Sequence, residues 1–431
     1  MSKWEFLELS ELCDLEKGKT GLMKAKEGQY TLVATGKDRR TCDTYQFDTK
    51  AVCVPLVSST GHGHASLKYV HYQEGKFALG TILVAVIPKD DKILNAQFLH
   101  LYLSRLKDIV LVPLMTGAAN VTLTVTKLKT VKVPLPPIEE QLRIVSLFNS
   151  MDNEQAELTN EISYQQELLK KLCQSILQEA IEGKLTTSWR EQNLNVESAS
   201  VLLEKIKHEK EQLIKEKKIK KQKPLPLINE DEIPFDIPDS WEWCRLGSIT
   251  IINGGYAFKS HNYTNDGVRV IRISDFSENG FINKNIVKHN FSNELEQYVL
   301  NNKNIIMAMT GGTVGKSFFI ENLKEIFVTN QRVATIKVIT PIIELYIYYM
   351  IQTNLIKNII KNAKNSTNDN ISMNEINGFY IALPPYQEQK EIVKKIESLF
   401  KICDELEIQI NSSKINSQTL MQAVLKEAFE K

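Results

Sequence analysis

The sequence lacks the features that would assign it to several common classes of protein. It has no run of about 20 apolar residues, so we expect no membrane-spanning helix. Its net charge is only +1, so no overall basic excess points to nucleic acid. The six cysteines include no Cys-x-x-Cys pair, which argues against a disulfide framework and a zinc site and favours a reducing compartment. The polar N-terminus is unlike a signal peptide, so we expect a cytoplasmic protein.

Catalytic signatures are missing as well. Residues 310–317 resemble a phosphate-binding loop, but that loop needs glycine at the position of Thr310. Residues 383–386 read Leu-Pro-Pro-Tyr and lack the Asn or Asp with which amino-directed DNA methyltransferases hold the target base. No Gly-x-Ser-x-Gly or His-Glu-x-x-His motif occurs. We therefore expect no catalytic residue, no metal and no cofactor in this chain.

Three histidines lie close together in the sequence, at His62, His64 and His71. Neutral imidazoles bind transition metals, so a metal site is one interpretation. No carboxylate or cysteine stands at a supporting spacing, and Gly61 and Gly63 suggest a flexible turn. A loop that contacts DNA or packs locally is the favoured interpretation.

The strongest positive feature is an internal repeat. Residues 136–183 align with residues 384–431 at a constant offset of 248, and 16 of the 48 pairs are identical. Each copy opens with Leu-Pro-Pro-x-x-x-Gln, and a tryptophan-containing segment opens each half at Trp4 and Trp241. A repeat of this length predicts two similar long helices, each preceded by a globular unit. Two such halves suit a ligand with two halves, of which duplex DNA is the commonest.

The repeated segments predict helical rods. They contain almost no Gly or Pro after the opening Pro-Pro step, and apolar residues recur at steps of three, four and seven. A rod of some 45 residues is roughly 65–70 Å long and cannot bury its apolar stripe alone. We expect the two rods to pack antiparallel. The stripe and partner-facing residues are Pro136, Gln141, Val145, Phe148, Leu158, Ile162, Leu172 and Ile176 in the first copy and Pro384, Gln389, Val393, Ile396, Leu406, Ile410, Leu420 and Val424 in the second.

The remaining segments predict two globular units of the α+β class. Short β-branched runs such as 31–34 and 268–273 predict strands, and 96–106 and 342–351 predict short helices. Residues 1–135 contain two Asn and residues 241–383 contain 21, so the two units present different surfaces. Residues 204–223 hold nine lysines, which fit a solvated helix better than a phosphate-binding segment.

The chain resembles the DNA-specificity subunit of type I restriction–modification systems. The resemblance rests on the doubled Trp openings, the doubled Leu-Pro-Pro-x-x-x-Gln starts and the lysine-rich segment that ends in Pro224-Leu225-Pro226. The second unit adds Gly-Tyr-Ala-Phe-Lys-Ser at 255–260, Thr-Gly-Gly-Thr-Val-Gly-Lys at 310–316 and Asn-Gln-Arg at 330–332. The first unit has neither Thr-Gly-Gly-Thr nor Asn-Gln-Arg.

The resemblance implies a fold and a division of labour. Two mixed α/β target-recognition domains, at 1–135 and 236–383, would each read half of a split site on double-stranded DNA. Spacer helices at 136–190 and 384–431 would form an antiparallel coiled coil with a pseudo-twofold repeat, and 191–235 would be a helical, lysine-rich linker. Two modification subunits carrying S-adenosylmethionine would bind the coiled coil, and motor-nuclease subunits would complete the complex. The chain itself would be non-catalytic and would contact no membrane.

The resemblance and the loop chemistry together give a set of expected DNA contacts. They are Lys19, Arg39, Arg40, His62 and His64 in the first unit and Lys259, Ser260, Arg272, Thr310, Gly311, Thr313, Lys316, Gln331 and Arg332 in the second. The alternative function is a single-chain DNA methyltransferase or nuclease with an unrecognised active site, for which the sequence shows none of the usual motifs.

Overall fold

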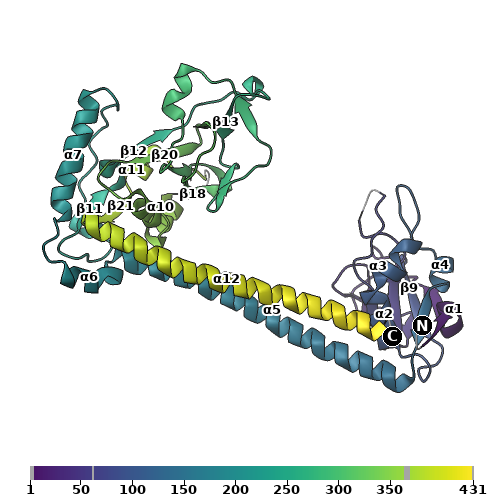
Figure 1. Ribbon diagram of the computed structural model, residues 1–431. Coiled ribbons are helices and arrows are strands. Elements are labelled where there is room, and N and C mark those ends of the chain that lie inside the picture. The colour runs from purple at the N-terminus through teal and green to yellow at the C-terminus, as the bar shows by residue number, and fades with distance from the viewer. Residues whose placement is uncertain (1–3, 61–62, 364–368, 430–431) are drawn as a thin grey trace. The chain divides into compact units, whose positions relative to one another are not determined.

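A computed structural model describes residues 4–60, 63–363 and 369–429 (Figure 1). The chain divides into two compact units. Unit 1 comprises Met1–Tyr164 with Ile410–Lys431, and unit 2 comprises Gln165–Gln409. Each unit combines a globular α/β domain with parts of two long helices, α5 (Ile138–Ile181) and α12 (Tyr386–Phe429). None of the helices in these described ranges combines the length and apolar character that a membrane span requires.

Unit 1 contains two four-stranded sheets and one strand pair. The pair joins β1 (Glu5–Glu8) to β10 (Lys132–Leu135). One sheet has the order β2 (Cys13–Lys17), β9 (Leu83–Pro88), β6 (Ala51–Pro55), β7 (His71–Gln73). The other has the order β4 (Arg40–Cys42), β3 (Tyr30–Val33), β8 (Lys76–Leu79), β5 (Phe47–Asp48). The short helices are α1 (Leu9–Leu12), α2 (Ala96–Arg105), α3 (Lys107–Val110), η1 (Val112–Leu114) and α4 (Val125–Lys129).

Unit 2 is built from similar parts, with one four-stranded sheet and one three-stranded sheet. Its main sheet has the order β12 (Thr250–Gly254), β20 (Val333–Val338), β17 (Ile305–Ala308), β18 (Ser317–Phe319). A second sheet joins β16 (Val287–His289), β13 (Val268–Ile271) and β19 (Phe327–Thr329), and strand pairs join β11 (Glu242–Arg245) to β21 (Tyr380–Leu383) and β14 (Phe276–Ser277) to β15 (Gly280–Phe281). The helices are η2 (Lys184–Thr186), α6 (Thr187–Gln192), α7 (Ala199–Lys215), η3 (Glu230–Glu232), α8 (Leu246–Ile249), η4 (Ser260–Asn262), η5 (Asn293–Tyr298), η6 (Gly311–Thr313), α9 (Glu344–Ile351), α10 (Asn354–Ala363) and α11 (Met373–Asn377).

The two units share one strand arrangement. The order β2-β9-β6-β7 in unit 1 corresponds to β12-β20-β17-β18 in unit 2, and all of these pairings are antiparallel. The parallel pair β3-β8 corresponds to the parallel pair β13-β19. The predicted mixed α/β class is confirmed, and so are the predicted strands and short helices, since β3, β13, α2 and α9 cover them to within two residues.

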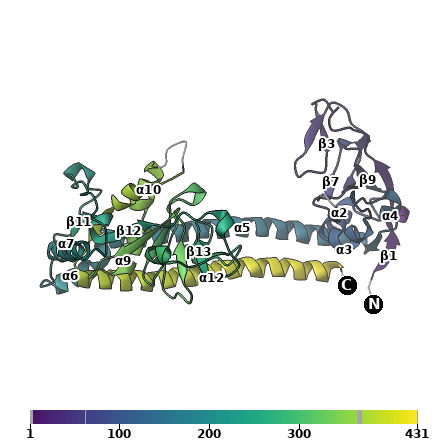
Figure 2. The same ribbon diagram turned by 90° about the horizontal axis from the view of Figure 1, so that it is seen from above.

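In each unit, the start of one of the long helices α5 and α12 packs beside the end of the other. In unit 1, the start of α5 and the end of α12 share a core, with the Phe148 ring 6.1 Å from that of Phe429. Phe429 also lies 5.8 Å from Phe98 and 5.5 Å from Tyr102, both on α2. In unit 2, the end of α5 and the start of α12 share a core that includes Ile176. The two helices therefore run in opposite directions within each unit, as Figures 1 and 2 show.

Two buried glutamines fix the start of each helix. Both side chains are fully buried, one turn after the Pro-Pro step. The Gln141 side chain donates from Nε2 to the carbonyls of Pro136 (2.9 Å) and Ile93 (2.8 Å), and its Oε1 accepts from the Asn95 amide at 2.8 Å. The structure therefore places Gln141 against its own globular domain rather than on the surface between the helices.

Gln389 makes two equivalent contacts in unit 2. Its Nε2 donates to the Pro384 carbonyl at 2.9 Å, and its Oε1 accepts from the Ile343 amide at 2.9 Å. Ile343 stands 248 residues after Asn95, the same offset that separates the two glutamines. The Leu-Pro-Pro-x-x-x-Gln motif is thus a device that attaches each helix to the domain before it.

The other predicted stripe residues divide into two groups. Pro136, Val145, Phe148, Ile162, Ile176, Pro384, Val393 and Ile396 are buried, and Ile410 and Val424 are half-buried. Leu158, Leu172, Leu406 and Leu420 are exposed, at 38%, 44%, 38% and 61%. These four leucines form two pairs at the repeat offset, so both helices expose apolar surface at matching positions.

We expect Gln389→Ala to lower the free energy of unfolding of unit 2 by about 1–3 kcal/mol, because the Ile343 amide and the Pro384 carbonyl lose their buried partner. Gln387→Ala, at an exposed position of the same helical turn, is the matched control and should change it by less than about 0.5 kcal/mol. Urea unfolding followed by circular dichroism measures both. Equal stability of the two variants would contradict the proposed attachment.

Candidate nucleic-acid interface

Three loops of unit 2 meet at one end of its main sheet. They follow β12, precede β20 and follow β17, and the antiparallel pairing brings these three strand ends together. The Gln331 amide donates to the Tyr256 carbonyl at 2.9 Å, and the Met309 amide donates to the Arg332 carbonyl at 2.9 Å. The three segments singled out in the sequence of the second unit are therefore neighbours in space.

Gly255 allows two of these loops to approach closely. A Cβ atom at this position would lie 2.3 Å from the carbonyl oxygens of both Thr329 and Asn330. Contacts this short do not occur between real atoms, so any side chain would push the loop after β12 away from the turn before β20. The backbone at this end of the sheet is accordingly held in one arrangement.

Two side chains at the meeting point are free to contact a ligand. Gln331 and Arg332 are exposed, and their side chains have no partner among the residues that the structure describes. Ser260, the first residue of η4, and Lys259, which precedes it, are also exposed. An amide and a guanidinium side by side at a loop tip are suited to bidentate contacts with base edges in the major groove.

Two other predicted contacts are occupied within the protein. The Arg272 guanidinium donates to the buried Asp275 carboxylate from Nε (2.7 Å) and Nη2 (2.8 Å), and this pairing raises the pKa of the arginine. The Lys316 ammonium donates to the Ile273 carbonyl at 2.7 Å and lies 4.7 Å from the centre of the Phe276 ring. Burial lowers the pKa of Lys316. Both side chains hold the loops together from inside.

The Thr-Gly-Gly-Thr segment forms a short turn. The Gly311 amide donates to the Asp369 carbonyl at 2.7 Å, and Gly311 adopts a φ of +76°, a conformation that favours glycine. Thr310 is half-buried, and Thr313 is exposed. The segment follows a strand but leads into β18 instead of a helix, so it lacks the helix N-terminus on which a nucleotide phosphate would rest.

In unit 1, Lys19, Arg39 and Arg40 are all exposed, and the Arg39 side chain is held by β7. The Arg39 guanidinium donates to His71 Nδ1 at 3.0 Å and to the Tyr72 carbonyl at 3.3 Å. Burial, with the neighbouring Arg39 charge, lowers the pKa of His71 to about 4, so its imidazole is neutral at pH 7 and accepts this bond. Arg39 therefore stabilises the domain edge.

The remaining histidines lie in the loop after β6. His64 is exposed, and its carbonyl accepts from Ser58 Oγ at 2.6 Å. His62 lies outside the described residues. Within the described ranges, no group of three or more His, Cys, Asp and Glu side chains is placed to hold a metal ion.

Comparison with known proteins places this fold. The family model described as the type I restriction modification DNA specificity domain matches residues 1–167 and 238–413. The chain belongs to this family. The match covers the sheets of both units and most of both long helices, which agrees with the shared strand arrangement, and it leaves out residues 168–237.

Three relatives illustrate the similarity. The specificity subunit of the type I restriction enzyme EcoAI of Escherichia coli is 31% identical over 69% of this chain and 58% of its own length. The HsdS subunit of Thermoanaerobacter tengcongensis has a TM-score of 0.55 at 17% identity, over 99% of this chain and 96% of that chain. A structure from a study of type I R-M complex assembly has a TM-score of 0.61 at 15% identity, over 99% of this chain and 97% of that one. The chain thus spans little more than half the length of the curated relative.

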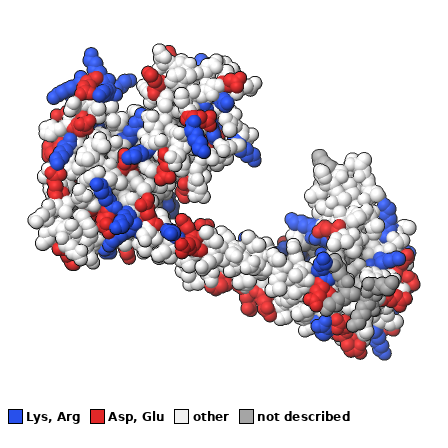
Figure 3. All heavy atoms as spheres, in the orientation of Figure 1, with Lys and Arg blue, Asp and Glu red and all other residues white. Residues whose placement is uncertain are grey.

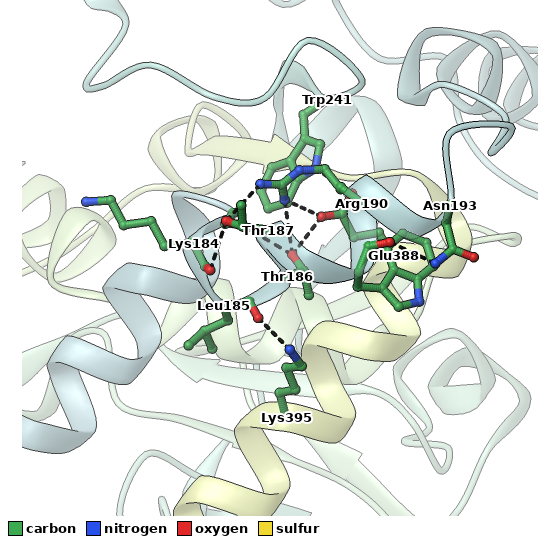
Figure 4. A network of polar contacts seen from close by, with 11 residues as sticks. Lys184, Leu185, Thr186, Thr187, Arg190, Asn193, Trp241, Glu388 and Lys395 are labelled. Carbon is green, nitrogen blue, oxygen red and sulfur yellow. Dashed lines mark hydrogen bonds and ion pairs between the residues drawn. The ribbon is translucent and has the colours of Figure 1, made fainter.

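Glu388, a buried carboxylate in unit 2, was not identified from the sequence. Glu388, on the first turn of α12, is fully buried and accepts from Thr186 Oγ1 (2.6 Å) and Arg190 Nη1 (2.5 Å) with one oxygen (Figure 4). Its other oxygen accepts from Trp241 Nε1 at 2.8 Å. All of these contacts lie within the protein, so the carboxylate joins the segment after α5 and the opening of β11 to α12. The only sequence signal was the identity of Glu388 with Glu140 across the repeat.

The lysine-rich segment is also part of unit 2. Leu202 and Ile206 of α7 lie in the unit 2 core, and Lys210 Nζ donates to the carbonyls of Gly247 and Thr250. Beyond α7, the chain is held by Arg245, whose Nε donates to the Pro226 carbonyl at 2.8 Å. Figure 3 shows Lys and Arg side chains gathered over the end of α7, at the upper left of the view, with acidic side chains among them.

We expect Arg272→Ala to lower the free energy of unfolding of unit 2 by about 2 kcal/mol, because the buried Asp275 carboxylate loses its charged donor. Arg332→Ala should change it by less than about 0.5 kcal/mol, because that side chain is exposed and unbonded within the described structure. Differential scanning calorimetry of the two variants tests the distinction. A large loss of stability in Arg332→Ala would identify Arg332 as a structural residue.

Proposed function

We propose that this chain is a non-catalytic subunit that recognises a bipartite sequence in double-stranded DNA within a type I restriction–modification complex. Each globular unit reads one half-site, and partner subunits carry out adenine methylation or cleavage. S-adenosylmethionine is expected in the modification partner, and no cofactor is expected in this chain. The complex would act in the cytoplasm, where cellular DNA is accessible.

The observation that carries the proposal is one strand arrangement, present twice, that ends in two sets of loops with unlike side chains. Base reading requires donors, acceptors and apolar groups held at defined positions in a groove, and it requires no catalytic group. In unit 2 the rigid frame presents Gln331 and Arg332 outward while Arg272 and Lys316 stay engaged inside. This pattern fits a reader domain better than a single-chain methyltransferase or nuclease.

The exposed leucines of the long helices favour a surface with two equivalent binding sites for partner subunits. Leu158 and Leu406, and likewise Leu172 and Leu420, are exposed at positions related by the repeat. Matching apolar positions on both helices are suited to two copies of one partner, bound through a pseudo-twofold repeat. We assign this surface to two modification subunits, with motor-nuclease subunits joining the assembly.

We further propose that α5 and α12 form an antiparallel coiled coil that sets the distance between the two half-sites. Each helix has 44 residues, or about 66 Å at the rise of an α-helix. That length is nearly two turns of B-DNA, at about 34 Å per turn. Two readers held along it could contact the same duplex with unread base pairs between them.

The direct test uses the full chain, alone and with its modification partner. In a gel-shift assay on random-sequence duplexes, we expect weak binding by the chain alone and tight binding in the presence of the partner. Methylome sequencing of a host that carries both genes should return one bipartite motif with a fixed spacer. Methyl transfer by the chain alone would instead support an enzyme with an unrecognised active site.

The spacer should depend on helix length. Residues 154–158 of α5 line a groove with residues 413–421 of α12, so removing residues 157–163 together with 412–418 shortens both helices and keeps their pairing. Seven helical residues span roughly 10 Å, the rise of about three base pairs. Methylome sequencing should therefore show the same two half-sites with a spacer shorter by about three base pairs. An unchanged spacer with an altered half-site would contradict the role of the helices as a ruler.

A further inference from the structure

The turn before β9 in unit 1 has the same backbone environment as the Asn-Gln-Arg turn of unit 2. The Gly80 amide donates to the Val33 carbonyl at 3.0 Å, the Thr81 amide to the Thr20 carbonyl at 3.2 Å, and the Ile82 carbonyl accepts from the Leu56 amide at 2.9 Å. These residues directly precede Leu83, the first residue of β9. Three hydrogen bonds therefore fix this turn from three neighbouring segments.

Each of these bonds has a counterpart in unit 2. The amide of Asn330 donates to the Ile271 carbonyl at 2.9 Å, and the amide of Gln331 donates to the Tyr256 carbonyl at 2.9 Å. The Arg332 carbonyl accepts from the Met309 amide at 2.9 Å. Gly80, Thr81 and Ile82 are thus the structural equivalents of Asn330, Gln331 and Arg332, although the two triplets share no residue.

The loops that follow β6 in unit 1 and β17 in unit 2 also form equivalent hydrogen bonds. The Ser58 amide donates to the Val121 carbonyl at 2.9 Å, as the Gly311 amide does to the Asp369 carbonyl at 2.7 Å. The loop after β6, which carries Ser58 and His64, therefore corresponds to the Thr-Gly-Gly-Thr segment after β17.

A pair of glycines completes the match. A Cβ atom on Gly18 would lie 2.2 Å from the Gly80 carbonyl oxygen, and one on Gly255 would lie 2.3 Å from the Asn330 carbonyl oxygen. The loops after β2 and β12 thus approach the equivalent turns equally closely.

The side chains at the two turns differ in chemistry. Unit 2 presents the amide of Gln331 and the guanidinium of Arg332, whereas unit 1 presents the hydroxyl of Thr81 and the apolar side chain of Ile82. Ile82 is 37% exposed, although both β9 and the preceding β8 consist mainly of buried residues. An arginine can bind guanine through O6 and N7, whereas an apolar group can contact only the thymine methyl in the major groove.

We propose that the turn Gly80–Ile82 is a base-reading turn of unit 1 and that Ile82 selects a thymine through its methyl group. This inference rests on the proposed function and assigns a base-reading site to unit 1, whose sequence contains neither Thr-Gly-Gly-Thr nor Asn-Gln-Arg. The two half-sites are then read by equivalent turns with different chemistry: apolar contact in unit 1 and bidentate hydrogen bonding in unit 2.

The test is methylome sequencing of a host that expresses the full chain with its modification partner. Ile82→Ala should relax the first half-site at one base pair, lowering the preference for thymine there by about tenfold, because the contact with the thymine methyl is lost. Ile82→Arg should replace that thymine by guanine, and the second half-site should stay unchanged in both variants. Arg332→Ile should alter one position of the second half-site only.

Ile109→Arg is the matched control, because Ile109 is 71% exposed on α3 of the same unit and lies outside the turn. It should leave the motif unchanged. If Ile82→Arg abolished methylation altogether, the Ile82→Ala variant would provide the test of the assignment. An unchanged first half-site in Ile82→Ala would overturn the assignment of Ile82. A wild-type methylome without any bipartite motif would overturn the proposed function itself, and the inference with it.

Discussion

The buried glutamine at the start of each long helix is the contact on which the rest of the structure depends. In each unit, its amide group bonds to a proline carbonyl just before the helix and to the backbone of the segment that precedes a short helix of the globular domain. Buried hydrogen bonds therefore set the direction in which each helix leaves its domain. Breaking them would leave buried polar groups without partners, which costs free energy. Because both units use the same bonds, each globular domain is attached to its long helix in the same way.

Within each domain, the backbone and the side chains have separate tasks. Main-chain hydrogen bonds and a glycine without room for a side chain hold the loops at the end of the main sheet. The outward-facing side chains at these loops take little part in that network, so they can differ between units without altering the frame. Under the proposed function, one fold could in this way serve two unlike half-sites, because the exposed side chains would carry the specificity.

The long helices, their Pro-Pro starts and the mixed α/β class could be predicted from the sequence, because these features depend on local periodicity and on residues close together in the chain. Whether an individual charged residue is paired within the protein or exposed could not be predicted from the sequence. Arg272 and Arg332 look alike as sequence, but only Arg272 has a carboxylate three residues later that the fold brings into contact. The partners of Glu388 come from positions 186, 190 and 241, which no spacing rule connects. The equivalence of Ile82 with Arg332 was invisible because it is carried by main-chain bonds alone.

Phe429 has a consequence for the order in which the protein folds. Its ring completes an aromatic cluster with Phe98, Tyr102 and Phe148, so the core of the first globular unit includes a residue that is translated after the whole second globular domain. At about 5–20 residues per second, roughly 15–60 s of synthesis separate Phe148 from this partner. The globular domain of unit 1 therefore keeps part of its core uncovered until the globular domain of unit 2 has been translated. A chain that stops before Phe429 would leave this aromatic cluster incomplete.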